Sequence, residues 1–263
     1  MRGMLEVEQL SFAYAGRQVL TDISFSAAQG ELLSILGANG TGKSTLFKCI
    51  LNLLPDYEGS VRVDGTVLRG MRAGELARKI AYIPQVSASA FNYSVEEIVL
   101  MGATASLGLL RSPGKKERAA AENAMQRVGI EQLRNRCFHH LSGGEKQLAI
   151  LARALTQESR ILLLDEPVSA LDYGNQMKIL SLAKSLASED YTVVQTTHDP
   201  EKAFMFSDRI VALQNGRIFK MGTPKDVLDE DCMHALYNVD TDVKSIYDDR
   251  VRVFTPKSMA ESE

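Results

Sequence analysis

The chain has 263 residues, of which 45% are hydrophobic and 24% charged, and its 30 Lys and Arg residues nearly balance 33 Asp and Glu residues. This composition can bury a sizeable core, so it excludes wholesale disorder, and the length suits one large domain with lobes or two small domains. The formal net charge of -3 gives no global attraction to a phosphate backbone, which argues against a dedicated nucleic-acid binder.

Short apolar runs alternate with helical patterns along the chain. The runs are short enough for strands buried on both faces, and they lie at residues 32–36, 80–83, 161–164 and 191–194. This alternation predicts an α/β fold with a parallel sheet. The pairs Asp64-Gly65 and Asn215-Gly216 each separate two strand-like segments, so they predict hairpins and an antiparallel portion.

A helical lobe is predicted between about residues 87 and 159, where strand signals are scarce. Within it, Pro113 can open a helix whose Ala121, Met125 and Val128 share one face, and Gly129 can end that helix. The lobe therefore interrupts the sheet-forming part of the chain as an insertion.

The uncharged stretch at residues 98–110 is too short to cross a bilayer as a helix, and it contains Gly102 and Gly108. We expect a buried or partner-facing segment there. From residue 223 onward ten acidic residues outnumber five basic ones, which predicts a solvated acidic appendage over residues 223–263.

The cysteines and the N-terminal residues suit a protein that stays inside the cell. Cys49, Cys137 and Cys232 are far apart and lack CxxC spacing, so neither a disulfide framework nor a zinc site is indicated. The first residues show no signal-peptide pattern. Cys49 is expected to act as a small buried hydrophobic residue.

A glycine-rich loop follows the first apolar run and matches the phosphate-loop pattern G-x-x-x-x-G-K-[ST] between a strand and a helix. Its glycines let backbone N–H groups turn toward phosphate oxygens, and the helix adds the positive end of its dipole. Lys43 would reach the β and γ phosphates, and Ser44 would bind Mg²⁺. The alternative is a chance glycine-rich turn. The loop consists of Gly37, Ala38, Asn39, Gly40, Thr41, Gly42, Lys43, Ser44 and Thr45.

Two carboxylates, Asp165 and Glu166, stand where the buried run at residues 161–164 ends, before Pro167. Ligands collect at this end of parallel strands. Asp165 is suited to hold the metal, while Glu166 could orient or deprotonate the water that attacks the γ phosphate. The alternative is a plain strand exit with solvated acids.

Ser142 opens a helical pattern, and Glu145 three residues later gives a capping-box spacing. Capping alone does not require Gly143 and Gly144, because glycine in a first helical turn costs up to about 1 kcal/mol against alanine. Without side chains at these two positions, an anion can approach the backbone N–H groups closely. Since the chain already has one phosphate loop, a second anion-binding helix start suggests that the same phosphate is approached from another molecule.

Together these motifs resemble the ATP-binding subunit of an ABC transporter over nearly the whole chain. Residues 37–45 resemble Walker A, residues 161–166 Walker B with its catalytic glutamate, and residues 141–147 the family signature. Four further features resemble family elements: the Q-loop glutamine Gln85, the D-loop at residues 169–172, the switch histidine His198 and the adenine-stacking aromatic Tyr14.

The resemblance implies a P-loop NTPase of ABC type, with a mixed-sheet core, an antiparallel β subdomain and the inserted helical subdomain, over residues 1–222. It also implies that two chains sandwich two ATP molecules head to tail, so that Ser142, Gly143 and Gly144 act on the partner's nucleotide and Asp172 of the D-loop lies near it.

The resemblance further assigns Gln85 to sensing Mg²⁺ and the attacking water, and His198 to the γ phosphate. Without the resemblance, each of these residues has a simpler interpretation. Gln85 would be an ordinary loop amide, and Tyr14 would pack in the core or on an edge strand. His198 would be a loop residue before the predicted helix cap Asp199. Lys146 and Val168 depart from residues frequent in the family and remove no group that the chemistry needs.

Segments at residues 91–102, 171–176 and 197–200 resemble the importer branch that moves ferric siderophores, haem or cobalamin. This implies a permease, an extracytoplasmic substrate-binding protein as an indirect partner, and a peripheral place at the cytoplasmic face of the membrane. The apolar side chains within residues 91–110 would then serve for docking or as lobe core.

Other functions stay open. Related ATPases serve molybdate or tungstate permeases, and soluble non-transport ABC ATPases act in iron–sulfur assembly. A DNA-repair module is disfavoured by the missing coiled-coil insertion, the missing zinc motifs and the acidic balance. A GTPase is disfavoured because an NKxD-type segment is missing.

Overall fold

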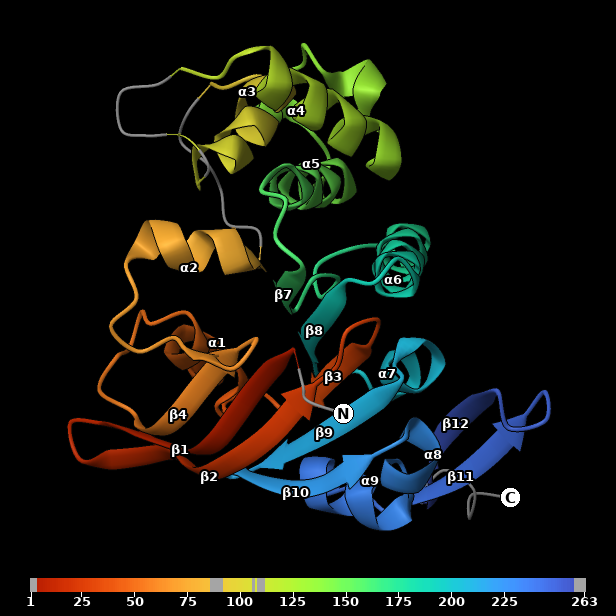
Figure 1. The fold of residues 1–263 in the computed structure, drawn as a ribbon. Helices are drawn as coiled ribbons and strands as arrows, with labels where there is room; N and C mark the ends of the chain where they lie inside the picture. Colours follow the sequence, from red (N-terminus) through yellow and green to blue (C-terminus); the bar gives the residue numbers. More distant parts are fainter. Residues whose placement is uncertain (1–3, 86–91, 106, 108–111, 258–263) are drawn as a thin grey trace. The chain divides into compact units, whose positions relative to one another are not determined.

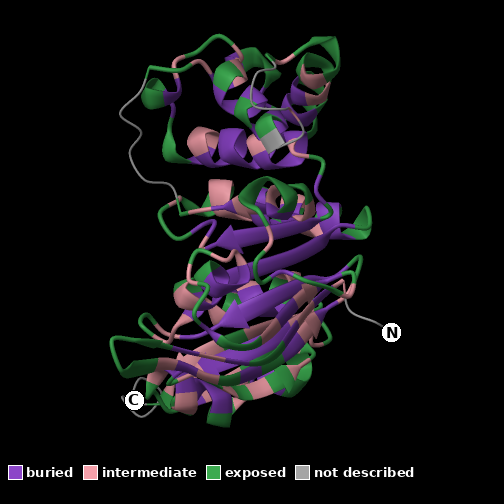
Figure 2. Cartoon of the chain, turned by 60° about the vertical axis from the view of Figure 1, so that its left-hand side comes forward, coloured by how far each residue is buried: buried purple, intermediate pink, exposed green. Residues whose placement is uncertain are grey.

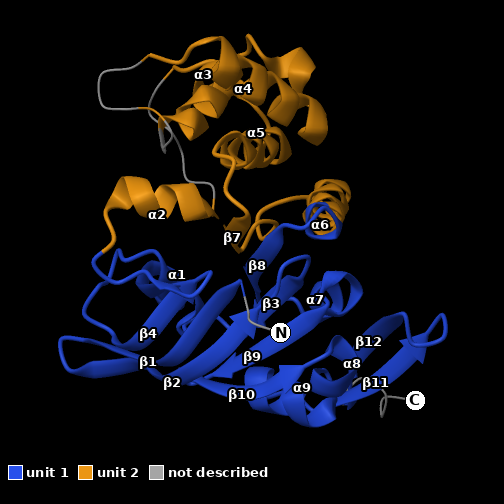
Figure 3. Ribbon diagram, in the orientation of Figure 1, with its two compact units in different colours: residues 1–70, 186–263 blue, residues 71–185 orange. Residues whose placement is uncertain are grey.

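The computed structural model describes residues 4–85, 92–105, 107 and 112–257 (Figure 1). The chain forms two compact units (Figure 3). Unit 1 comprises residues 1–70 and 186–263, and unit 2 comprises residues 71–185. These bounds differ from an insertion at residues 87–159 and from a division after residue 222, because two strands group with the helices of unit 2 while the C-terminal elements group with unit 1.

One sheet of unit 1 is antiparallel, with strand order β2-β1-β4-β5. Val7 of the central strand β1 pairs with Phe25 on one side and Val61 on the other, and all three are buried. The predicted hairpin at residues 64–65 is confirmed, because β4 and β5 pair directly across it. The strands are β1 (Leu5–Tyr14), β2 (Arg17–Ala27), β4 (Glu58–Val63) and β5 (Thr66–Val67).

The second sheet of unit 1 is mixed, with strand order β10-β9-β3-β8. β3 (Leu32–Leu36) is buried at all five positions and runs parallel to both β8 (Thr192–Thr197) and β9 (Arg209–Gln214). β10 (Arg217–Gly222) pairs antiparallel to β9 across the predicted second hairpin, where Asn215 and Gly216 have φ of 47° and 72°. The predicted parallel and antiparallel portions are thus confirmed in this unit.

β8 differs from its predicted range of residues 191–194. It runs on through Gln195, Thr196 and Thr197, which are polar and nevertheless buried. Gln195 donates a hydrogen bond to the hydroxyl of Ser34 on β3 at 2.9 Å, so its amide is partly satisfied inside the sheet. An apolar run marks only the first part of such a strand.

The C-terminal segment packs on unit 1, so its description as a solvated appendage is wrong for much of its length. It forms α8 (Pro224–Val227), α9 (Glu230–Tyr237) and the antiparallel pair β11 (Thr241–Ile246) and β12 (Val251–Pro256). Leu228, Cys232 and Leu236 lie in one buried cluster with Leu36 of β3 and Phe204. Glu230 and Asp231 of α9 are exposed, so acidity and burial coexist on one helix. Figure 2 colours the chain by burial.

Two further helices of unit 1 follow strands of the mixed sheet. α1 (Lys43–Ile50) follows β3, and α7 (Pro200–Phe206) follows β8. Cys49 on α1 is fully buried, which agrees with its predicted packing role, and burial raises the pKa of its thiol to about 12.

Unit 2 contains a parallel strand pair, β6 (Ile80–Ile83) and β7 (Ile161–Asp165), and the predicted helical lobe. α4 (Lys115–Val128) buries Ala121, Met125 and Val128, and it ends at Gly129 with φ of 71°, as predicted. It begins two residues after Pro113 rather than at it. The other α-helices are α2 (Ala73–Lys79), α3 (Val95–Leu100), α5 (Gly143–Thr156) and α6 (Tyr173–Ser188), which extends past the unit boundary.

The segment of residues 91–110 is described only in part, and Phe91, Gly108 and Leu110 lie outside the described residues. Where it is described, Val95, Ile98, Val99, Leu100 and Ala103 are buried, which favours lobe core over docking at these positions, while Tyr93 and Met101 are exposed. Among helices in the described ranges, none combines the length and apolarity needed to span a membrane.

Candidate functional site

The phosphate-loop motif connects β3 to α1 within unit 1. The backbone N–H of Gly37 donates to the carbonyl of Thr197 at 3.2 Å, which fixes the start of the loop beside the end of β8. A Cβ at Gly37 would lie 2.5 Å from the carbonyl oxygen of Leu213, so only glycine fits. Gly42 has φ of 104° and also lacks room for a Cβ, because Leu20 lies 2.8 Å away. The loop path thus depends on glycine at both ends.

Lys43 is the first residue of α1 and is only 4% exposed. Its ammonium donates to the carbonyls of Gly37 at 2.8 Å and Ala38 at 3.1 Å, so a positive charge lies inside the loop. Ser44 next to it is exposed. Gly42 caps α1 without any side-chain acceptor, which leaves first-turn amides to bind an anion. The loop therefore offers backbone amides and a positive charge to an anion such as phosphate.

His198 lies where β8 ends and α7 begins. The predicted helix start is confirmed, since Asp199 caps α7 by accepting from the N–H of Lys202 at 3.0 Å and Pro200 follows it. His198 is exposed, and its backbone carbonyl accepts a hydrogen bond from Tyr237 at 2.9 Å. Because the preceding residue contacts the phosphate loop, the structure brings His198 and this loop together.

Tyr14 stands at the end of β1, in the antiparallel sheet rather than the sheet that carries the phosphate loop. Its side chain is 43% exposed and packs edge to face on Phe12, with ring centroids 4.8 Å apart. The turn into β2 follows at Ala15 and Gly16, which both have positive φ. Its exposure suits a base platform, and stacking on adenine stays a prediction.

The carboxylate pair lies in unit 2 at the end of β7. Asp165 is 7% exposed and accepts a hydrogen bond at 3.2 Å from the hydroxyl of Tyr82 on β6. Burial, together with the charge of Asp165, raises the pKa of Tyr82, so the phenol keeps its proton and stays a donor. Asp165 is thus oriented by a residue of the neighbouring strand. It is not a solvated acid at the end of a strand, which was the alternative interpretation.

Gln85 and Glu166 lie at the same edge of the β6–β7 pair, each two residues beyond the paired Ile83 and Leu164. The Gln85 amide donates to the hydroxyl of Ser169 at 3.0 Å, and this hydroxyl donates to the carbonyl of Glu166 at 3.2 Å. Glu166 has φ of 44°, a conformation that residues with a Cβ rarely adopt. Gln85 is therefore joined through the Ser169 hydroxyl to the backbone of Glu166, the proposed catalytic carboxylate.

Ser142 caps α5, as the structural interpretation predicts. The N–H of Glu145 donates to the Ser142 hydroxyl at 3.3 Å, and the N–H of Ser142 donates to the Glu145 carboxylate at 2.8 Å. Hydrogen bonds from the backbone N–H and the side chain of Ser142 to this carboxylate hold the pKa of Glu145 below its usual range. The cap is therefore a complete capping box, which explains Ser142 without excluding a second role.

The structure adds a packing reason for Gly144. A Cβ there would lie 2.5 Å from the side chain of Asn175 on α6, whereas one at Gly143 would lie 3.2 Å from Leu171. Asn175 is itself held by Asp172, whose carboxylate accepts from the Asn175 backbone at 3.0 Å and from its side-chain amide at 2.6 Å. The amide hydrogen bonds lower the pKa of Asp172. Gly144 and Asp172 therefore meet through Asn175.

The site residues thus fall into two groups. Unit 1 joins the loop of residues 37–45 with His198, and Tyr14 lies apart from them in its other sheet. Unit 2 joins Gln85 with the carboxylate pair, and the signature serine and glycines with Asp172.

Sequence reasoning missed three contributors: Tyr82, Asn175 and Tyr237. Tyr82 lies in a predicted strand, and its contact with Asp165 follows only from the register between β6 and β7. Asn175 lies three residues after Asp172, the spacing at which an Asp side chain caps a helix, so local sequence could have predicted this contact. Tyr237 is far along the chain from His198, so no local pattern marks it.

Comparison with known proteins finds one family over much of the chain. The family model described as "ABC transporter" matches residues 20–169. A hemin import ATP-binding protein HmuV of Rhizobium etli is 38% identical over 242 residues, which cover 89% of this chain and 90% of that protein. A protein of Helicobacter pylori named "Probable iron chelatin transport ATP-binding protein" is 37% identical over 254 residues, covering 95% and 99%.

Solved structures agree with this similarity. An inward-facing conformation of a metal-chelate type ABC transporter contains a chain that is 32% identical, with a TM-score of 0.86 and coverage of 98% of this chain and 100% of that one. The cbiO1 protein of Clostridium perfringens, part of the cbiONQ ABC transporter complex, is 31% identical with a TM-score of 0.78, covering 86% and 91%.

Proposed function

Since the chain belongs to the ATP-binding subunits of ABC transporters, we propose that it hydrolyses ATP to power uptake of a metal chelate such as a ferric siderophore, haem or cobalamin. The observation that carries the ATPase assignment is the buried ammonium of Lys43 inside a loop in which a Cβ at Gly37 or Gly42 would clash. The similarity to hemin and iron chelatin transport subunits and to a metal-chelate type transporter supports the substrate class.

ATP is bound through its phosphates in this proposal. The loop of residues 37–45 offers backbone amides and the α1 N-terminus, and Lys43 adds a positive charge for the β and γ phosphates. Tyr14 offers an exposed ring on which adenine could stack. Affinity then comes from local backbone geometry and one lysine, so an overall charge of -3 is no obstacle.

Mg²⁺ fits the side chains that the proposal assigns to it. The donors are the hydroxyl of Ser44, the carboxylate of Asp165 and the amide oxygen of Gln85, all oxygen ligands of the kind this ion prefers. Within the described residues no cluster of three or more His, Cys, Asp or Glu could hold a metal. Such a donor set suits an ion held jointly with nucleotide phosphates, and the ion would neutralise charge on those phosphates.

Three residues carry the catalytic step in this proposal. Glu166 accepts a proton from the water or orients it, and its backbone is tied to Gln85 through Ser169. His198 donates to the γ phosphate and stabilises the charge that develops there. Gln85, which also lies in the Q-loop, links this step to the permease-coupling surface.

The partners follow from the same family membership. ATP-binding subunits of importers work with membrane permease components. We propose that two copies of this chain form a head-to-tail dimer in which Ser142, Gly143 and Gly144 contact the partner's nucleotide and Asp172 of the D-loop lies near it. The dimer would lie on the cytoplasmic face of the membrane against the permease, which in turn receives substrate from a binding protein.

Affinity purification from detergent-solubilised membranes tests the transport assignment. The full-length tagged chain and its Lys43→Ala variant should both copurify with an integral membrane protein, because docking needs no nucleotide. Cells lacking the chain should recover uptake of the chelate with the natural chain and fail with Lys43→Ala. Recovery of only a soluble scaffold complex would contradict transport and favour the iron–sulfur assembly type. Restored uptake of molybdate or tungstate alone would contradict the chelate assignment.

A further inference from the structure

Tyr237, the last residue of α9, donates a hydrogen bond from its hydroxyl to the backbone carbonyl of His198 at 2.9 Å. Its ring packs against the buried cluster that joins α7, α8 and α9 to the mixed sheet. Burial raises the pKa of Tyr237, so the phenol keeps its proton at neutral pH and remains a donor. A residue of the C-terminal segment therefore holds the peptide that carries the switch histidine.

The loop from Thr197 to Asp199 is held at each of its three residues. The Thr197 carbonyl accepts from the N–H of Gly37 at 3.2 Å, and the Thr197 hydroxyl accepts from the N–H of Asp199 at 3.1 Å. The side chain of Asp199 caps α7. The His198 peptide thus lies between a contact with the phosphate loop and a contact with α9.

The inner face of α9 anchors the helix in unit 1. Cys232, Met233 and Leu236 are buried, and Leu236 shares its cluster with Leu36, the residue directly before the phosphate loop. At the other end of α9, the capping residue Asp229 forms an ion pair with Lys220 of β10 at 2.5 Å. Helix α9 is therefore fixed to the same sheet that presents the phosphate loop.

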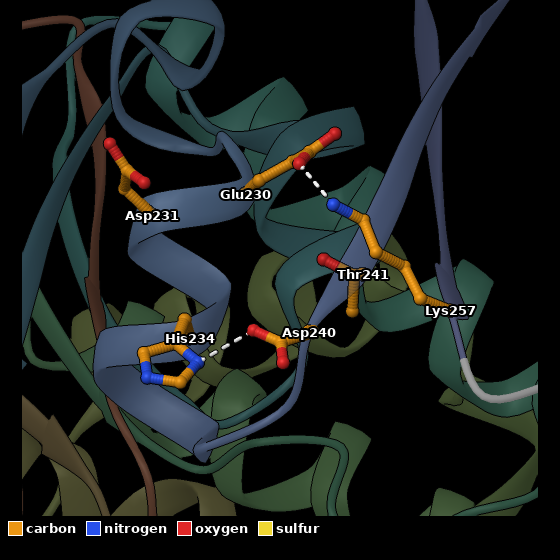
Figure 4. A pocket seen from close by; sticks show the side chains of 6 residues that line it. All are labelled: Glu230, Asp231, His234, Asp240, Thr241 and Lys257. Carbon is orange, nitrogen blue, oxygen red and sulfur yellow. Dashed lines mark hydrogen bonds and ion pairs between the residues drawn. The ribbon is translucent and has the colours of Figure 1, made fainter.

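The outer face of α9 lines a cavity of about 360 Å³ (Figure 4). There His234 contacts Asp240 at 2.9 Å and Lys257 contacts Glu230 at 2.8 Å, which tie the helix to the segment that follows it. Exposed pairs of this kind stabilise weakly, so the buried inner face carries most of the anchoring. The hydroxyl of Tyr237 thus extends from a supported helix.

We propose that Tyr237 is a positioning residue for ATP hydrolysis, fixing the His198 peptide so that the imidazole is directed at the transferred phosphate. The proposal rests on the proposed role of His198 at the γ phosphate. Tyr237 has no place among the groups assigned to the nucleotide or the metal, so it acts through His198. Its loss should lower kcat and leave the KM for ATP nearly unchanged, since the phosphate loop still binds ATP.

The Tyr237→Phe variant of the full chain tests this, because it removes the hydroxyl and keeps the ring. We expect a kcat about three- to tenfold lower, the range for losing one hydrogen bond, with a KM within about twofold. Tyr247→Phe is the matched control, since its side chain is 75% exposed in the turn between β11 and β12. An unchanged kcat for Tyr237→Phe at equal thermal stability would overturn the proposal.

A double-mutant cycle separates positioning from a general structural effect. In a His198→Ala background, adding Tyr237→Phe should leave the residual kcat unchanged, because the hydroxyl then has no catalytic side chain to position. A loss by the same factor in both backgrounds would overturn the proposal. Wild-type turnover by His198→Ala alone would contradict the proposed role of His198, and the positioning proposal would fall with it.

Discussion

The hydroxyl of Tyr82 and the Oδ2 atom of Asp165 are 3.2 Å apart, and the bond joins two neighbouring parallel strands. β6 and β7 pair with Tyr82 opposite Leu163, so the phenol reaches two residues further along β7. Asp165 is nearly buried, and a buried carboxylate needs such donors. Tyr82 therefore fixes one oxygen of the proposed metal-binding carboxylate.

Tyr82→Phe should raise the Mg²⁺ concentration needed for half-maximal ATP hydrolysis by about tenfold, because groups that orient a metal-binding carboxylate typically matter at this level. A Mg²⁺ titration of phosphate release at saturating ATP measures this. Tyr247→Phe makes the same chemical change at an exposed position and should leave the titration unchanged. Identical titrations for Tyr82→Phe and the natural chain would remove Tyr82 from the metal site.

Ser142 has both a capping role and a proposed phosphate role, and two variants separate them. Ser142→Ala removes the cap and should lower the free energy of unfolding by about 1 kcal/mol. Ser142→Asp retains a capping oxygen but places a negative charge where the partner's phosphate is expected, so stability should persist while hydrolysis falls more than about tenfold. Thermal unfolding and phosphate release measure the two effects. Full activity of Ser142→Asp would contradict the phosphate role and leave Ser142 with the capping role alone.

Gly144→Ala should destabilise unit 2, because the new Cβ would lie 2.5 Å from Asn175, which Asp172 holds in place. We expect a loss of about 1–3 kcal/mol, the range for overpacking. Gly143→Ala is the matched control, since a flexible Leu171 side chain at 3.2 Å can yield and alanine favours the helix. Adding Asn175→Ala to Gly144→Ala should recover much of the stability. Equal melting temperatures for both single variants would contradict the close packing.

The three cysteines should differ in reactivity with a thiol reagent near pH 8. Burial raises the pKa of Cys49 to about 12 and that of Cys232 to about 11, so at pH 8 both remain protonated and unreactive, and reactivity should rise only as pH approaches these values. Cys137 is half-buried and should react first. One fast thiol is expected in the native chain and three after denaturation. Fast labelling of Cys49 would contradict its buried packing role.

Local sequence patterns predicted much of unit 1 and the start of the site. The buried, mostly apolar strand β3, the hairpin at Asn215 and Gly216, and the loop of residues 37–45 each carry their signal within a few neighbouring positions. The α4 helix was equally predictable, because its buried face and its terminal Gly129 are both regular.

What the sequence could not reveal depends on contacts between distant segments. The Tyr82 contact needs a strand register, and the clash at Gly144 needs the position of α6. The C-terminal segment misled prediction because acids on one face of α9 dominate its composition, while Cys232 and Leu236 on the other face decide its packing. Net charge reports on solubility and says little about burial.

The proposed mechanism of ATP hydrolysis is tested most directly by turnover of Glu166→Gln, which keeps the shape of the side chain and removes the carboxylate. ATP binding should stay within about twofold of the natural chain, while phosphate release should fall about 100-fold or more, the range for losing a general base. Light scattering should show an ATP-bound dimer accumulating, and the exposed control Glu131→Gln should turn over normally. Normal turnover by Glu166→Gln would contradict the assignment of this carboxylate and the mechanism built on it.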